Sequence, residues 1–306
     1  MNPIDRAFTA AEARITTWRY RSPYFDHFCR AILRYEEVQG GRLAAAIAYY
    51  GFFAVFALLL IGYSVFGFLI TNNVALLDLV QDFLRHNLPF LDIQAILDTK
   101  KTVGIVGLVG LTLTGIGWVE AIRSSQRLVW QLREQPGYFG IRQALDLLVL
   151  IGVLLLLALT QLAVYGLETL LHWLAGGGFQ GILSVIGFVC TLAVNMLLAA
   201  ALLAAVPRLR MTARRMGPPV MQVGIGLMLL NTVGKSFVGI VERNPAYGLV
   251  GSAVGALVYL YVFNQILLFG AAWAATSPHG RVVDLAADDK TVPVGQNTWI
   301  RHARPR

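Results

Sequence analysis

Five amide side chains lie within long apolar stretches of this chain and are the first candidates for a functional site. They are Gln161, Asn195, Asn231, Asn264 and Gln265. An amide without a hydrogen-bond partner is costly in apolar surroundings, so we expect these side chains to face the interior of a helix bundle. They either hold helices together by hydrogen bonds, about 0.6–2 kcal/mol each, or line one polar cavity, to which Tyr49 and Tyr50 could contribute.

A charged pair, Glu120 and Arg123, follows directly after an apolar run. Residues three apart are neighbours on a helix surface, so the two side chains can form a local ion pair. The alternative is a functional role, as a gate or as a contact for lipid headgroups. The sequence leaves both interpretations open.

Residues that could hold a catalytic metal are scattered. The five histidines are His27, His86, His172, His279 and His302, and they belong to different segments. The sequence contains no HxH, HxxEH or DxD cluster of metal ligands, no phosphate-binding glycine signature and no serine nucleophile elbow. We therefore predict that the protein is not an enzyme and has no catalytic residue, no metal and no cofactor.

The elements that must position these residues are six runs without Asp, Glu, Lys, Arg or His. The runs cover 43–77, 102–119, 147–167, 173–207, 216–234 and 244–278. A bilayer core about 30 Å thick needs roughly 20 apolar helical residues for one crossing, so each run supplies one span. Charged residues make up 14% of the chain, against about a quarter in soluble domains. The sequence predicts an all-α membrane protein with six transmembrane helices.

The predicted domain organisation follows from the same runs. A basic segment, 1–42, precedes the six-helix domain 43–276, and a polar tail, 277–306, follows it and is expected to be disordered. The spans are predicted at about 43–70, 102–122, 147–167, 181–206, 217–236 and 246–275. The longest segment on the outer side, roughly 72–101, is expected to form short helices over the outer face of the bundle.

The basic residues predict the orientation of the chain. Of 25 Lys and Arg residues, 20 fall in the two terminal segments and the two loops on their side of the membrane, and 5 fall on the opposite side. Positive charge accumulates on the cytoplasmic side of membrane proteins, so both termini are predicted to be cytoplasmic. The net charge of +8 then reflects contact with anionic lipid headgroups, and we expect no nucleic-acid partner.

The basic N-terminal segment contains an amphipathic pattern. Its apolar and aromatic residues recur on one helix face at Tyr24, Phe28, Ala31, Ile32 and Tyr35. Such a helix with interspersed arginines suits the membrane interface. The alternative is a short soluble helix that packs on the cytoplasmic loops.

Several short motifs, in their order along the chain, resemble the YihY/BrkB family of bacterial inner-membrane proteins, which carries an old ribonuclease BN label. The motifs are AAAIAYY at 44–50, SQRLVW at 125–130, Val206-Pro207, and QILLFGA at 265–271. The resemblance covers about 30–276 and is strongest to the YhjD-like branch. Three positions depart from the family pattern: Gln126 stands where Asn is usual, Ala272 where an acidic residue is usual, and Ala57 near an expected proline.

The resemblance implies a multi-pass protein of the bacterial inner membrane, often described as a transporter of lipid-linked or amphiphilic substrates. The main hypothesis is therefore a transporter or flippase-like protein for an amphiphilic or anionic envelope molecule, with membrane lipids as partners. The alternative is a non-transporting scaffold for envelope assembly, with a solidly packed interior. A membrane-associated nuclease is a distant third. The sequence does not predict the substrate, the coupling ion or the oligomeric state.

Overall fold

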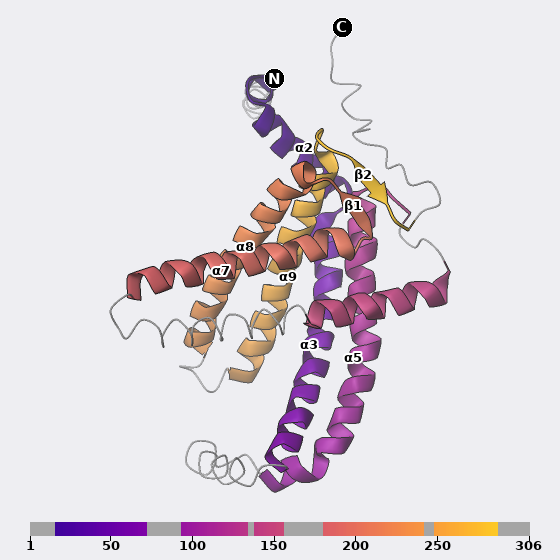
Figure 1. Cartoon of the computed structure of the whole chain (residues 1–306), viewed down its shortest axis with the longest axis vertical. Coiled ribbons are helices and arrows are strands. Elements are labelled where there is room, and N and C mark those ends of the chain that lie inside the picture. The colour runs from indigo at the N-terminus through magenta and orange to yellow at the C-terminus, as the bar shows by residue number, and fades with distance from the viewer. Residues whose placement is uncertain (1–15, 72–92, 134–137, 156–179, 242–247, 287–306) are drawn as a thin grey trace, which may run out of the picture.

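The computed structural model describes residues 16–71, 93–133, 138–155, 180–241 and 248–286, and helices dominate them. The elements follow in the order α2 (Pro23–Glu37), α3 (Gly40–Thr71), α5 (Ile93–Val129), α7 (Gln180–Ala200), π-helix η1 (Ala201–Ala205), β1 (Leu209–Met211), α8 (Ala213–Val241), α9 (Gly248–Thr276) and β2 (Val282–Asp284). A further helix covers 139–155. Figure 1 shows their arrangement.

Helix α2 begins and ends with well-defined signals. The hydroxyl of Ser22 accepts a hydrogen bond from the Phe25 backbone N–H, and Pro23 occupies the first helical position. The chain then turns at Gln39, which has a φ of 53°, and α3 starts at Gly40. A Cβ atom at Gly40 would overlap the ring of Tyr35. The turn from α2 to α3 therefore depends on a glycine at this position.

Helices α3 and α5 form an antiparallel pair that extends beyond the other helices at one end (Figure 1). The pair is held at short range by small residues. A Cβ atom at Gly107 would lie 3.0 Å from the backbone nitrogen of Ile61, and one at Gly104 would overlap the hydroxyl of Ser64. Glycines allow the two helix backbones to approach closely, as in many membrane helix pairs.

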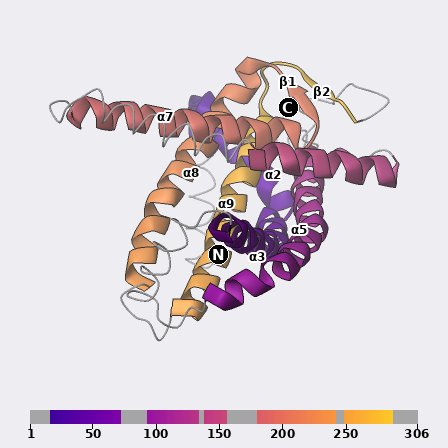
Figure 2. The same ribbon diagram turned by 60° about the horizontal axis from the view of Figure 1, so that its bottom comes forward.

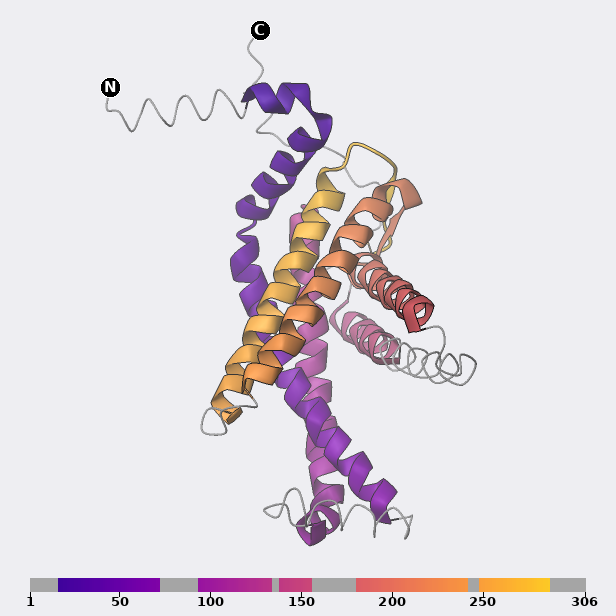
Figure 3. The ribbon, with the colours of Figure 1, turned by 90° about the vertical axis from the view of Figure 1, so that its left-hand side faces the viewer.

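Helix α9 is the centre of the remaining packing, because it contacts α8, α3 and α2. Helix α7 packs on α8 and lies across it, as Figures 1 and 2 show. Figure 3 shows that α7 and the helix 139–155 project from the same side of the bundle. The core where these elements meet contains fully buried Ile47, Ile122, Leu203 and Leu267.

Helix α2 docks on the last turns of α9. Nε2 of His27 lies 3.0 Å from the carbonyl oxygen of Trp273, and the ring of Tyr35 packs edge-on against Phe269. Ala31 is fully buried, whereas the side chain of Tyr24 is 81% exposed. The predicted apolar face is thus used partly for packing on α9, and its placement at the membrane interface stays a prediction.

The segment after α9 differs from the expected disordered tail. Strand β2 pairs antiparallel with β1, with Leu209 opposite Asp284 and Met211 opposite Val282. Val282 and Asp284 are both buried. The expectation of disorder was wrong for 277–286, because alternating side chains of this short segment find buried partners on other elements. The remainder of the tail, 287–306, lies outside the described residues.

The all-α membrane class is confirmed. Within the described ranges, five helices have the length and apolar composition needed to cross a membrane: Gly40–Val65, Lys101–Val129, Val185–Ala205, Ala213–Gly234 and Ala253–Thr276. The predicted third span, 147–167, is described only as far as residue 155. The count of six therefore stays a prediction. The expectation of separate short outer helices was wrong for 93–101, because these residues form the first turns of α5, and 72–92 lie outside the described residues.

Candidate functional site

A pocket of about 770 Å³ lies between the α2–α3 turn and the helices α8 and α9. Its lining residues come from the end of α2, the turn after it, the start of α3, and α8 and α9: Tyr35, Glu36, Gln39, Gly41, Arg42, Gln222, Gly226, Gln265, Ile266 and Phe269. The pocket therefore joins segments that are far apart in the sequence. Its size lies within the range of about 300–1,000 Å³ that is typical of small-molecule sites.

The local sequence explains how the two long helices form one wall of the pocket. Gln222 and Gly226 lie one turn apart on α8, and Gln265 and Phe269 have the same spacing on α9, so each pair shares a helix face. A Cβ atom at Gly226 would lie 2.7 Å from Cγ2 of Ile266. Glycine at this position lets α8 and α9 approach each other beside the pocket.

The pocket combines charged, polar and apolar groups. The side chains of Glu36 and Arg42 are exposed, and Arg42 donates a hydrogen bond to the amide oxygen of Gln39. The hydroxyl of Tyr35 is buried without a hydrogen-bond partner among the described residues. Burial raises the pKa of Tyr35 to about 12, and nearby Tyr261 and Glu36 add to this effect. Tyr35 thus stays protonated near neutral pH and can donate a hydrogen bond.

Among the predicted amides that the structure describes, only Gln265 lines the pocket. Asn231 accepts a hydrogen bond from the Tyr259 hydroxyl, which links α8 to α9. Fully buried Asn264 donates to the carbonyl oxygen of Leu260 within its own helix, 2.8 Å away. Its own amide oxygen has no hydrogen-bond partner in the described ranges.

The other predicted site residues are distributed over different parts of the fold. Asn195 is buried on α7, and Gln161 lies outside the described residues. The rings of Tyr49 and Tyr50 are 58% and 43% exposed on α3 and are not part of the pocket lining. The structure thus brings Gln265 together with residues that the sequence did not single out, and the functional role of each candidate stays a prediction.

A second polar feature, buried ion pairs around α5, lies where the sequence indicated only Glu120 and Arg123. Arg123 donates from Nε and Nη2 to the two carboxylate oxygens of Asp146, at 3.0 and 2.9 Å, and both side chains are fully buried. Glu120 is more distant from the Arg123 guanidinium, at 3.8 Å, and lies 3.7 Å from that of Arg142. The expected local pair exists but is secondary to the pair with Asp146.

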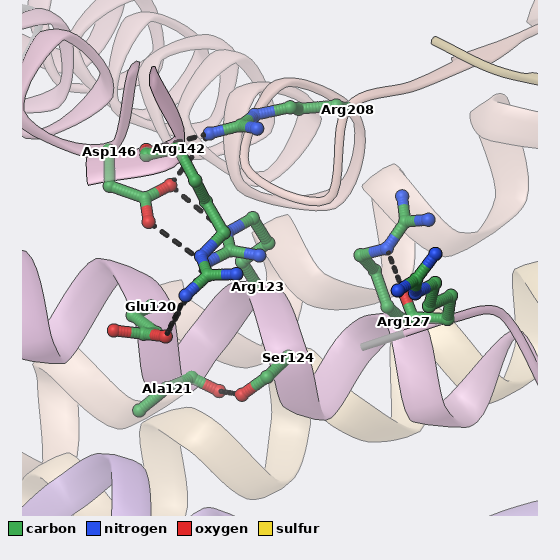
Figure 4. Close-up of polar contacts among 9 residues, drawn as sticks. Glu120, Ala121, Arg123, Ser124, Arg127, Arg142, Asp146 and Arg208 are labelled. Atoms are coloured by element: carbon green, nitrogen blue, oxygen red, sulfur yellow. Dashed lines mark hydrogen bonds and ion pairs between the residues drawn. The ribbon is translucent and has the colours of Figure 1, made fainter. Parts of the chain in front are cut away.

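Asp146 also binds a second arginine, and Figure 4 shows the contacts of its carboxylate as dashed lines. Nη2 of Arg208 lies 2.9 Å from Oδ1 of Asp146. Arg208 has a φ of 59°, a backbone conformation that is uncommon for residues other than glycine. The contact joins α5, the helix 139–155 and the turn before β1. We call Glu120, Arg123, Arg142, Asp146 and Arg208 the charged cluster.

Arg127 lies one turn beyond Arg123 on the same face of α5 and connects this helix to the C-terminal segment. Its guanidinium donates to both carboxylate oxygens of Asp284, at 2.9 and 2.6 Å. It also donates to the carbonyl oxygens of Pro207 and Arg133. Burial would raise the pKa of Asp284, but hydrogen bonds from Arg127 and from the Ala286 backbone, with the Arg127 charge, lower that pKa below its ordinary value.

Arg215 is the third fully buried arginine at this end of the bundle, and its partners are carbonyl groups and a ring. It donates to the carbonyl oxygens of Ala274 and Ala275, at 2.8 and 2.9 Å, and lies over the ring of Trp130. The last carbonyls of a helix lack partners within the helix and carry partial negative charge. Arg215 therefore stabilises the C-terminal end of α9 and joins it to the start of α8.

Sequence reasoning missed these contacts because it treated the arginines as charges that flank spans. The signal that was available is the spacing of Arg123 and Arg127, which places two arginines on one face of a helix next to apolar residues. Their partners, Asp146 and Asp284, are 23 and 157 residues away. No local pattern connects residues at such separations.

Metal ligands do not gather in the part of the chain that the structure describes: no group of three or more His, Cys, Asp or Glu side chains could hold a metal ion there. The absence of a metal or cofactor site in the whole chain stays a prediction.

Comparisons with known proteins give a consistent result. The family model described as Virulence factor BrkB matches residues 31–293. The chain is 27% identical over 279 residues to the inner membrane protein YhjD of Escherichia coli (strain K12), and the match covers 85% of this chain and 83% of that protein. It is also 27% identical over 289 residues to an uncharacterized protein of Dickeya dadantii (strain 3937), with coverages of 86% and 87%. No solved structure matches.

Proposed function

The chain belongs to the virulence factor BrkB family, and we propose that this member is an inner-membrane transporter or flippase-like protein for an amphiphilic or anionic envelope molecule. The observation that carries the proposal is the pocket of about 770 Å³ between the α2–α3 turn, α8 and α9. Charged groups at its rim and apolar side chains in its wall fit a molecule with a polar head and an apolar chain.

The proposed location places the pocket at the cytoplasmic side of the inner membrane. A relative over most of the chain is named an inner membrane protein. The excess of Lys and Arg in the terminal segments favours cytoplasmic termini. With this orientation, α2 and the start of α3 lie at the level of the inner leaflet's headgroups. Membrane lipids are the proposed partners, and neither an enzymatic activity nor nucleic-acid binding is part of the proposal.

The test is transbilayer movement of a fluorescent phospholipid in vesicles that contain the purified full-length protein. We expect the wild-type protein to accelerate this movement and Gln222→Trp to reduce it at least several-fold, because the larger side chain narrows the pocket between α8 and the α2–α3 turn. The matched control is Met221→Trp, which changes the neighbouring residue on α8, whose side chain is 53% exposed and absent from the pocket lining. Met221→Trp should retain wild-type movement.

Two results would contradict the proposal. One is a folded wild-type protein that moves no phospholipid, which favours the scaffold alternative. The other is equal movement by both tryptophan variants, which would place the path elsewhere. Size-exclusion profiles and melting temperatures of all three proteins establish that each variant is folded.

A further inference from the structure

We propose that the pocket selects a zwitterionic phospholipid whose headgroup carries a primary ammonium, taken from the leaflet next to the α2–α3 turn. The inference rests on the proposed function, because it names the class of molecule that the same pocket holds. It follows from the signs and positions of the charged groups in the lining and from the neutral polar and apolar side chains beside them.

The pocket lining contains one negative and one positive side chain. Glu36 lies at the end of α2 and Arg42 at the start of α3, so the α2–α3 turn holds opposite charges on its two sides. Neither forms an ion pair with another described residue. Glu37, directly after Glu36, is already paired with Arg34 at 3.1 Å. A carboxylate and a guanidinium therefore remain for a ligand that carries both charges.

The chemistry of Glu36 distinguishes among headgroups. A primary ammonium has three N–H donors that a carboxylate can accept, whereas a trimethylated ammonium has none. A headgroup whose only charge is the phosphate would place this anion on Arg42 but would offer no cation to Glu36. The two side chains together therefore favour an ammonium and a phosphate in one headgroup.

The rest of the lining suits the remainder of such a lipid. The amide groups of Gln222 and Gln265 can donate to phosphate or ester oxygens. Ile266 and Phe269 supply an apolar surface on α9. The lining thus offers charged, neutral polar and apolar groups, which the headgroup, the glycerol region and an acyl chain of one phospholipid can use.

The experiment measures phospholipid retention by the full-length protein in vesicles or nanodiscs of defined composition. The probes are phosphatidylethanolamine, phosphatidylcholine and phosphatidylglycerol, mixed in equal amounts and quantified by native mass spectrometry. We expect the wild-type protein to retain phosphatidylethanolamine about two- to five-fold over either other lipid, which is the upper part of the range for an exposed charge pair. Glu36→Gln should abolish this preference, and Arg42→Gln should lower retention of all three lipids.

Glu37→Gln is the matched control, because Glu37 is the adjacent acidic residue and is not part of the pocket lining. It should keep the wild-type preference. Equal retention of the three lipids by the wild-type protein, or a preference that survives Glu36→Gln, overturns the inference. Either outcome can occur while phospholipid movement remains sensitive to Gln222→Trp, so the headgroup inference can fail without failure of the proposed transport. Loss of that sensitivity would reject both.

Discussion

Arg127 and Asp284 are 157 residues apart in the sequence, yet their side chains form a two-bonded ion pair with N–O distances of 2.9 and 2.6 Å. Arg127 is fully buried and Asp284 is 2% exposed. The pair fastens the segment after α9 to the end of α5. Together with the β1–β2 pairing, it makes the C-terminal segment part of the helix bundle at the end where Arg123, Arg208 and Arg215 also lie.

Replacing Asp284 with Asn is expected to destabilise the protein. The change removes a charge that is hydrogen-bonded to buried Arg127 and leaves the guanidinium with carbonyl partners only. Hydrogen bonds to charged groups contribute about 1.5–3 kcal/mol, so we expect a melting temperature lower by several degrees in detergent. Arg281→Gln is the control, because Arg281 lies beside β2 with an exposed side chain. A melting temperature for Asp284→Asn equal to that of the control would show that the pair contributes little.

The same pair predicts how stability depends on pH. The pKa of Asp284 in the folded protein is lower than its ordinary value of 3.8. Its contribution is therefore fully present above 3.8 and is lost as the pH falls through the lower folded value. The melting temperature of the wild-type protein should approach that of Asp284→Asn as the pH is lowered from 5 towards 3. A gap between the two proteins that stays constant over this range would contradict the prediction.

The helical architecture could be predicted from the sequence because it depends on local properties. The length of an apolar run determines whether a helix can cross a bilayer, and α3 and α9 accordingly cover the predicted spans 43–70 and 246–275 to within a few residues. The burial of the amides was inferred from cost alone. That argument predicts whether a side chain faces the interior of the bundle or the lipid. It does not predict which residue will be its hydrogen-bond partner.

The charged cluster and the pocket could not be predicted, because both depend on long-range packing. Gln265 reaches the pocket, while Asn264, the preceding residue, is buried in another direction within the same helix. The two side chains point in different directions because successive residues of an α-helix are rotated by about 100°. The segment 277–286 was wrongly expected to be disordered for a similar reason. Its polar composition suggested disorder, whereas the ion pair between Asp284 and Arg127, which holds it in place, joins residues far apart in the sequence.

Asp146 should be more important for stability than Glu120, although both are acidic members of the charged cluster. Asp146 is fully buried and bonded to Arg123 and Arg208, whereas the side chain of Glu120 is 27% exposed and more than 3.5 Å from its arginines. Removing one partner of a buried pair costs about 3–5 kcal/mol, and an exposed pair contributes about 0–1 kcal/mol. Asp146→Asn should therefore lower the melting temperature strongly and Glu120→Gln only slightly. A melting temperature of Asp146→Asn close to that of the wild-type protein would show that the cluster tolerates the loss of its central carboxylate.

The orientation of the chain gives the last prediction. Twenty of the 25 basic residues fall on the side of the membrane that holds both predicted termini, which favours a cytoplasmic location for that side.

Arg85 belongs to the segment after the first predicted span, and Ala303 belongs to the C-terminal tail. A reporter that is active only in the cytoplasm should therefore be inactive when fused after Arg85 and active when fused after Ala303. A second reporter, active only outside the cytoplasm, should give the opposite pattern. A fusion after Asp146, between the second and third predicted spans, should behave like the one after Ala303. The same signal at Arg85 and Ala303 would reject the six-span arrangement, because an odd number of crossings must separate those two positions.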